Sequence, residues 1–191
     1  MTDVSYIGID LAGSDLRETI TCVLIKNTLT FFSLYTDDQI IDFVQSYKPR
    51  IIAIDAPLQL PKVGWFRECD ILMKKMGLKP LPPMWKSMKK LTLRAIALKR
   101  KLKKFRIIET FPTGFLNVLR IKNIKKVDVQ HRVFGFILKT IKLKILNKTL
   151  FKKDVLDALI AAIAAYYYDN KIENCLLIKD EDCLIVIPKI L

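Results

Sequence analysis

Val4-Ser5-Tyr6-Ile7-Gly8-Ile9-Asp10-Leu11 is the stretch of sequence on which the prediction of the fold depends. It alternates at first and ends in an apolar run, which is typical of a strand buried at the centre of a sheet. Residues 19–25 and 29–35 are two β-branched and aromatic runs separated by a short polar segment, and they predict two more strands in a meander. The first third of the chain is therefore expected to form three consecutive antiparallel strands.

Helices and further strands alternate along the rest of the chain. The predicted helices cover residues 37–47, with Thr36 as the N-cap, and then about 65–76, 91–103, 127–146 and 153–168; the predicted strands cover 51–54, 106–108 and 183–187. This order is that of ribonuclease-H-like α/β folds. We expect a three-layer fold with a mixed central sheet (three antiparallel strands, then parallel ones), helices on both faces and an extra C-terminal strand. One domain is expected over residues 1–191, with a basic helical insertion around 77–104 and basic helices around 120–150.

The positive charge of the chain is concentrated in one segment. The formal net charge is +14, and 21 of the 33 Lys and Arg residues but only two of the 19 acidic residues lie between Lys86 and Lys153. Such a segment suits a polyanion, so DNA or RNA is the expected partner. The residues expected to contact its phosphates are Lys86, Lys99, Arg100, Lys101, Lys103 and Lys104. The alternative is a thermophilic protein whose lysines simply solvate its surface.

The composition argues against several classes of protein. Hydrophobic residues make up 51% of the chain, which is too many for a disordered protein. No apolar run reaches the ~18 residues of a membrane span, and no basic region precedes the first apolar run, so we expect a cytoplasmic protein. The four cysteines form no C-x-x-C motif and His131 is the only histidine, which argues against zinc and against Ser-His or Cys-His nucleophiles. Cys175 and Cys183 are a candidate disulfide pair.

Three acidic residues stand where apolar strands end. Asp10 ends the first strand, Asp55 ends the strand over 51–54, and Glu109 ends the strand over 106–108. The carboxyl edge of an open α/β sheet is where ligands gather, so these side chains are candidates for one site. Taken singly, the two aspartates could instead cap a following turn, and Glu109 could pair with a lysine or arginine.

Two more carboxylates lie on the last predicted helix. Asp154 and Asp157 are three residues apart and share a face, although Asp154 could instead serve the first turn of the helix. Small residues follow that would let the helix approach the sheet closely: Ala158, Ala161, Ala162 and Ala165. Converging carboxylates favour Mg²⁺ or Mn²⁺, and two ions about 3.5–4 Å apart would serve phosphodiester cleavage. We therefore expect Asp10, Asp55, Glu109, Asp154 and Asp157 as metal ligands.

Six short motifs carry a resemblance to a known family. They are 8–14 (GIDLAGS), 53–58 (AIDAPL), 67–70 (RECD), 91–94 (LTLR), 108–112 (IETFP) and 154–162 (DVLDALIAA). In this order they resemble an uncharacterised prokaryotic family described as predicted nucleases with a ribonuclease-H-like fold. The resemblance runs from about residue 5 to Pro188.

The resemblance extends to the Holliday-junction resolvases of the same superfamily. It implies that Asp10, Asp55, Asp154 and Asp157 are the catalytic, metal-binding residues of a Mg²⁺- or Mn²⁺-dependent nuclease for structured DNA or RNA. Members of the family often carry histidine where this chain has Lys153, a difference that leaves the carboxylates in place.

The sequence offers further candidate residues and two alternative functions. Residues that would support the site or contact substrate are Arg67, Asp70, Arg94 and Lys153, although Arg67 and Asp70 could form an ion pair with each other. One alternative function is nucleic-acid binding without catalysis. Another is an actin-like nucleotide phosphohydrolase, but such enzymes need two domains to enclose the nucleotide. The sequence leaves the oligomeric state open, a homodimer included.

Overall fold

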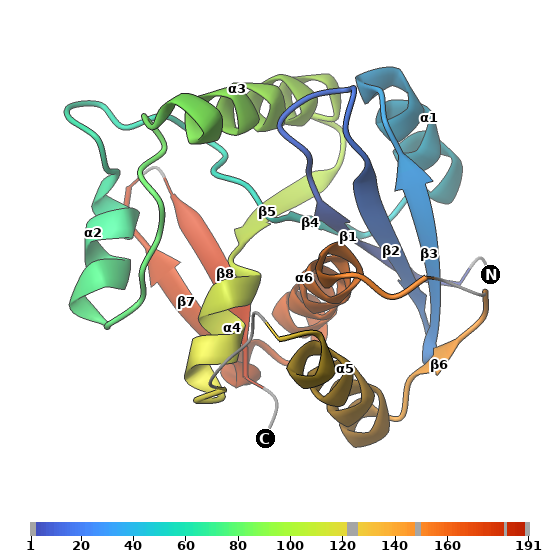
Figure 1. The fold of residues 1–191 in the computed structure, drawn as a ribbon. Coiled ribbons are helices and arrows are strands. Elements are labelled where there is room, and N and C mark those ends of the chain that lie inside the picture. The colour runs from blue at the N-terminus through green and yellow to red at the C-terminus, as the bar shows by residue number, and fades with distance from the viewer. Residues whose placement is uncertain (1–2, 122–125, 148–149, 182, 190–191) are drawn as a thin grey trace.

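The structure is a computed structural model that describes residues 3–121, 126–147, 150–181 and 183–189. Within these residues, one eight-stranded sheet forms the centre (Figure 1). Its strands are β1 (Ser5–Asp10), β2 (Thr19–Ile25), β3 (Thr28–Leu34), β4 (Ile51–Ile54), β5 (Arg106–Thr110), β6 (Lys144–Ile145), β7 (Cys175–Lys179) and β8 (Leu184–Pro188). They lie side by side in the order β6-β3-β2-β1-β4-β5-β8-β7.

The sheet changes from antiparallel to parallel pairing at its central strand. β1 pairs antiparallel with β2, which pairs antiparallel with β3, whereas β4 pairs parallel with β1 and β5 parallel with β4. β8 continues the parallel half beside β5, and β7 returns antiparallel beside β8. This arrangement confirms the predicted ribonuclease-H-like sheet.

Helices cover both faces of the sheet, so the molecule has three layers (Figure 1). The helices are α1 (Asp37–Tyr47), α2 (Glu68–Lys75), α3 (Lys86–Lys101), α4 (Pro112–Val118), α5 (Val127–Ile141), α6 (Lys153–Asn170) and the short η1 (Ile172–Asn174). Side chains of α1 and α3 share one core with Ile7 and Ile9 of β1. Side chains of α4, α5 and α6 share the other core, to which β1 contributes Tyr6. Alternate residues of β1 thus face opposite layers, as strand geometry requires.

The last helix lies very close to the central strand. An added Cβ at Gly8 would meet the backbone N of Ala162 at 2.1 Å and the backbone O of Ala158 at 2.3 Å. Glycine on β1 and alanines on α6 therefore allow this approach, as the run of small residues predicts. The contact fixes which residues of α6 reach the edge of the sheet.

Several predicted boundaries need correction. The helix predicted over 127–146 ends at Ile141 because Lys142 takes a left-handed conformation with φ 57°, and Lys144–Ile145 then pairs with β3. α3 begins at Lys86, earlier than predicted, and α4, β6 and β7 were not predicted. The single domain over residues 1–191, with a basic helical insertion around 77–104 and basic helices around 120–150, stays a prediction.

Two further findings bear on the sequence-based expectations. Cys69 and Cys183 form a disulfide, whereas Cys175 is a free buried thiol, so the pairing of Cys175 with Cys183 is wrong. No helix in the described part of the chain is long and apolar enough to cross a membrane.

Candidate metal centre

Three of the predicted carboxylates meet at one edge of the sheet. Asp10 ends β1, Asp55 directly follows β4, and Asp157 lies in the second turn of α6. One ligand atom from each of the three lies within 4.8 Å of the others. Oxygen-only donors of this kind suit hard divalent cations such as Mg²⁺, Mn²⁺ or Ca²⁺.

Local backbone structure accounts for this meeting. The backbone N–H of Asp55 donates to the carbonyl of Ile9 at 2.8 Å, so the parallel pairing of β1 and β4 continues to the carboxylates. Asp157 enters from above the sheet because α6 packs closely on Gly8. Two strand ends and one helix therefore fix the three side chains independently of any ligand.

The three carboxylates are held in an environment that disfavours negative charge. Burial and the neighbouring charges of Asp157 and Asp154 raise the pKa of Asp10 to about 8. Burial, together with Asp157 and Asp10, raises the pKa of Asp55 well above its ordinary value. Burial also raises the pKa of Asp157, although Lys153 opposes this shift. A bound cation would remove the mutual repulsion.

Asp157 gives the most direct indication that the site fits a cation. Within the described residues, its Oδ1 is buried and receives no hydrogen bond. Its Oδ2 accepts a hydrogen bond from the ammonium group of Lys153, one turn earlier on α6. Since a buried carboxylate oxygen without a partner is costly, Oδ1 has the properties of a metal-ligand atom.

The raised pKa of Asp10 predicts that the metal-free protein loses stability as the pH rises. Between pH 4 and 8 the unfolded chain releases the Asp10 proton while the folded chain keeps it, since the pKa rises from 3.8 to about 8 on folding. Asp10 should therefore lower the free energy of unfolding across this range by at most ~1.4 kcal/mol for each pH unit, and the raised pKa values of Asp55 and Asp157 should add to the fall. Urea denaturation in EDTA at pH 5, 6, 7 and 8 measures this fall.

The variant Asp10→Asn should show a shallower fall, and Asp15→Asn, which alters an exposed residue of the following turn, should match the wild type. An Asp10→Asn slope equal to the wild-type slope would contradict the buried, charge-coupled environment. Lys153 does not contribute to the pH dependence, because its pKa is raised and it stays charged throughout this range.

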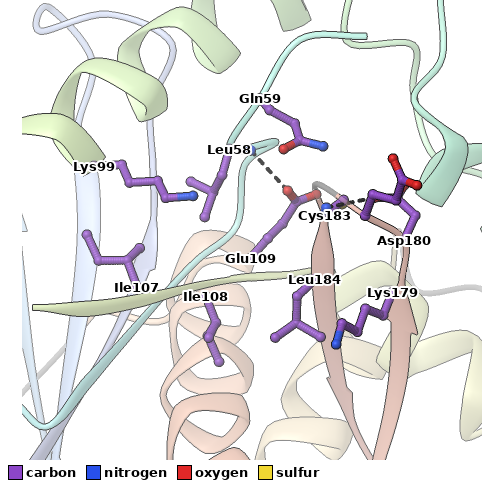
Figure 2. Close-up of a pocket in the computed structure, with 11 residues that line it drawn as sticks. Leu58, Gln59, Lys99, Ile107, Ile108, Glu109, Lys179, Asp180, Cys183 and Leu184 are labelled. Carbon is purple, nitrogen blue, oxygen red and sulfur yellow. Dashed lines mark hydrogen bonds between the residues drawn. The ribbon is translucent and has the colours of Figure 1, made fainter. Parts of the chain in front are cut away.

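Asp154 and Glu109, the other predicted ligands, lie outside the cluster of three. Asp154 is nevertheless close enough for its charge to raise the pKa values of Asp10 and Asp157. Glu109 is buried at the end of β5 and accepts hydrogen bonds at both oxygens from Arg67. Its Oε2 also accepts from the backbone N–H of Leu58 (Figure 2). Glu109 thus forms an ion pair with an arginine, which was the alternative to its predicted role as a metal ligand.

Arg67 connects two carboxylates in a buried network. Its guanidinium donates to both oxygens of Asp70, at 3.0 and 2.7 Å, and to both oxygens of Glu109, each at 2.7 Å. Burial opposes the charge of Arg67, but these two partners outweigh it and raise the pKa of Arg67. Bidentate pairing on both sides holds the start of α2 against the end of β5. The predicted ion pair between Arg67 and Asp70 is confirmed.

This network and two members of the carboxylate cluster line the same pocket, which has a volume of about 210 Å³. Asp10 and Asp55 contribute to its lining together with Arg67, Asp70 and Glu109, and α3 contributes Met88 and Leu91. The pocket therefore brings together β1, β4, β5, α2 and α3.

Arg94 binds the backbone of the loop that follows Asp10. Its side chain lies largely buried between α3 and α1, where it donates to Asp37 Oδ1 at 2.7 Å. It also donates to the backbone carbonyls of Ala12 and Tyr35. Arg94 thus fixes the loop that follows Asp10. The partner Asp37 was not predicted, because an acid in a first helix turn usually serves the helix dipole alone.

The predicted phosphate-contacting residues lie on or directly after α3. All six are exposed: Lys86, Lys99, Arg100, Lys101, Lys103 and Lys104. Lys99, Arg100 and Lys103 also line a shallow hollow of about 520 Å³ beside the loop at Leu58. Lys101 has a long contact of 4.0 Å with Asp38. Their exposure leaves their charges available to a partner.

The sheet topology and the carboxylates at its edge define a ribonuclease-H-like α/β protein with a candidate metal centre. The chain belongs to the family described as "Protein of unknown function (DUF429)", which it matches over residues 8–182. The resemblance drawn from the six motifs is thereby confirmed at the level of an uncharacterised family. No curated protein matches the chain. Among solved structures it is similar to RuvC of Thermus thermophilus, at 10% identity and a TM-score of 0.48, over 87% of this chain and 96% of that chain.

Proposed function

We propose that this protein is a nuclease that hydrolyses phosphodiester bonds with divalent cations bound by Asp10, Asp55 and Asp157. The observation that carries the proposal is the meeting of three carboxylates within 4.8 Å, one of them with a buried oxygen that receives no hydrogen bond. Mg²⁺ or Mn²⁺, as two ions, suits these donors. Asp154, the remaining predicted catalytic residue, would join them or hold a water at the site; its charge raises the pKa values of Asp10 and Asp157.

The protein side chains would have distinct tasks in this reaction. Divalent ions would supply an activated water and stabilise the leaving oxygen. Asp10 and Asp55 would orient the ions from the sheet, and Asp157 would do so from α6. The Lys153 ammonium, which hydrogen-bonds Asp157 Oδ2, would orient that carboxylate so that Oδ1 is left for the cation. Arg67 and Glu109 would keep the opposite wall of the pocket in position.

The basic residues of α3 support nucleic acid as the substrate. Met88 and Leu91, near the start of this helix, line the carboxylate pocket, whereas Lys99 and Arg100 lie near its end. From Lys86 to Lys99 the helix advances ~20 Å, the length of about six base pairs of duplex. A strand cleaved at the pocket could thus extend along α3 and meet these charges. The proposal includes a cytoplasmic location.

Binding of nucleic acid without cleavage is the second candidate function. The exposed charges of α3 favour it, because they would attract phosphates whether or not a metal is bound. Under this candidate, affinity would fall steeply with salt but would not depend on divalent cations.

The metal requirement of cleavage tests the proposal. The purified protein, treated with EDTA and then supplied with Mg²⁺, Mn²⁺ or Ca²⁺, is incubated with labelled single strands, duplexes and branched junctions of DNA and RNA. We expect cleavage of at least one substrate with Mn²⁺ or Mg²⁺ and none in EDTA. Salt-dependent binding without cleavage of any substrate would replace the proposal by the second candidate.

A further inference from the structure

A disulfide joins α2 to the C-terminal strands of the sheet. Cys69, in the first turn of α2, is bonded to Cys183, which directly precedes β8 and lies 114 residues further along the chain. Their Cα atoms are 6.3 Å apart. Cys69 is completely buried and Cys183 is 6% exposed. The crosslink therefore connects two elements that are distant in the sequence.

The disulfide and the Arg67 ion pairs hold the same helix against the same part of the sheet. Cys69 lies between Arg67 and Asp70 in the sequence, and Arg67 binds Glu109 at the end of β5. Glu109 is paired in register with Ile185 of β8, two residues after Cys183. The covalent and the ionic connection thus lie within a few residues of each other, both on α2 and on the neighbouring strands β5 and β8.

Two of the three buried residues of α2 take part in these two connections. The helix has eight residues, of which Cys69, Asp70 and Met73 are buried, whereas Ile71 and Leu72 are exposed. A helix of this length is not stable on its own and must be held by tertiary contacts. Loss of the disulfide would leave the Arg67 pairs and one buried methionine to retain it.

Cys183, one of the two bonded cysteines, is among the residues that line a pocket. Cys183 lines a pocket of about 220 Å³ together with Leu58, Lys99 and Asp180, and Figure 2 shows these side chains around it. The backbone N–H of Cys183 donates to Asp180 Oδ1 at 2.7 Å, which ties Cys183 to the residue that directly follows β7. The volume is sufficient for a small thiol. Cys183 retains 6% exposure, whereas Cys69 has none.

We propose that Cys183 is the site at which a small dithiol enters and opens this disulfide, which releases α2. The dithiol's thiolate bonds to Cys183 Sγ, the Sγ–Sγ bond breaks, and Cys69 leaves as a thiolate that takes a proton from solvent. The second thiol then displaces Cys183 as a thiol, and the dithiol is oxidised to its own disulfide. Loss of this covalent link would leave the Arg67 ion pairs in place but would let α2 move more, and with it Arg67 and Asp70, which line the carboxylate pocket. The exchange itself does not depend on the proposed nuclease activity.

Selective reaction of the two cysteines tests the site of entry. The variants Cys69→Ser and Cys183→Ser are exposed, folded, to the small disulfide of 2-mercaptoethanol, and the mixed disulfide is quantified by mass spectrometry. Cys183 in the first variant should react ~10-fold faster or more than Cys69 in the second. Equal rates, or faster reaction of Cys69, would overturn the proposal.

A measurement on the wild-type protein covers the case in which either variant fails to fold. The protein, isolated without reductant, is treated briefly with 2-mercaptoethanol and quenched in acid, and its peptides are mapped. We expect the 69–183 crosslink before treatment and a mixed disulfide on the Cys183 peptide afterwards. Absence of the crosslink, or a mixed disulfide mainly on Cys69, would overturn the proposal.

Amide hydrogen exchange tests the release of α2. On reduction with dithiothreitol, amides of α2 should exchange ~10-fold faster or more, and those of α1 should not change. The variants Cys22→Ser and Cys175→Ser, which alter free buried cysteines, should show the same response as the wild type. Equal exchange of α2 before and after reduction would show that the disulfide does not control the helix.

Discussion

Replacement of Asp55 by asparagine is expected to reduce metal-dependent cleavage by ~10³-fold or more, equivalent to about 4 kcal/mol of transition-state stabilisation. Asparagine keeps the size of the side chain but removes a negative charge that lies within 4.8 Å of Asp10 and Asp157. The remaining two carboxylates would bind a divalent cation more weakly and leave it misplaced. Cleavage should therefore be lost together with metal affinity.

Stability should move in the opposite direction, which separates a lost ligand from a damaged fold. Burial and the charges of Asp157 and Asp10 raise the pKa of Asp55, so a charged Asp55 is unfavourable in the metal-free protein. In EDTA at pH 8, Asp55→Asn should unfold at a temperature equal to or higher than that of the wild type. A variant that is inactive but at least as stable has lost function and not structure.

Single-turnover cleavage with Mn²⁺, metal titration by calorimetry and thermal unfolding in EDTA measure these three effects. Asp42→Asn is the matched control, because Asp42 is exposed on α1 and is not a member of the cluster. The control should retain wild-type cleavage. Cleavage by Asp55→Asn within ~3-fold of the wild type would exclude this site as the origin of the activity.

The positions of Asp10 and Asp55 could be predicted because each depends on one short segment. An apolar strand that stops at an acid places that acid at the edge of a sheet, whatever the rest of the chain does. Prediction of the position of Asp157 also required the stripe of alanines that brings α6 onto Gly8. Asp154 and Asp157 share a helix face, but the sequence could not show that Asp157 alone would be fully buried.

Contacts between distant segments could not be predicted in the same way. Glu109 pairs with Arg67, 42 residues away, and Cys69 bonds to Cys183 across 114 residues. No periodicity in the sequence marks such a pair. Many lysines and arginines could have paired with Glu109, and each cysteine had three possible partners. The end of α5 was missed for a local reason: Lys142 takes the left-handed conformation that glycine or asparagine usually marks.

The contact between α6 and β1 predicts a large loss of stability from one added methyl group. In Gly8→Ala the new Cβ would lie 2.1 Å from the backbone N of Ala162 and 2.3 Å from the backbone O of Ala158. Both atoms belong to the helix backbone, so a change of rotamer cannot relieve the overlap. The helix would have to move away from the sheet, at a cost of ~3 kcal/mol or more in the free energy of unfolding.

Gly13→Ala is the matched control, because an added Cβ there would meet its nearest neighbour, Leu91, at an ordinary 3.9 Å. Urea denaturation should show a change below ~1 kcal/mol for Gly13→Ala and the large loss for Gly8→Ala. Because the displaced helix carries Asp157, any folded Gly8→Ala protein should also bind Mn²⁺ more weakly, although no carboxylate has been altered. Equal stability and equal Mn²⁺ affinity in the two variants would show that α6 does not set the geometry of the cluster.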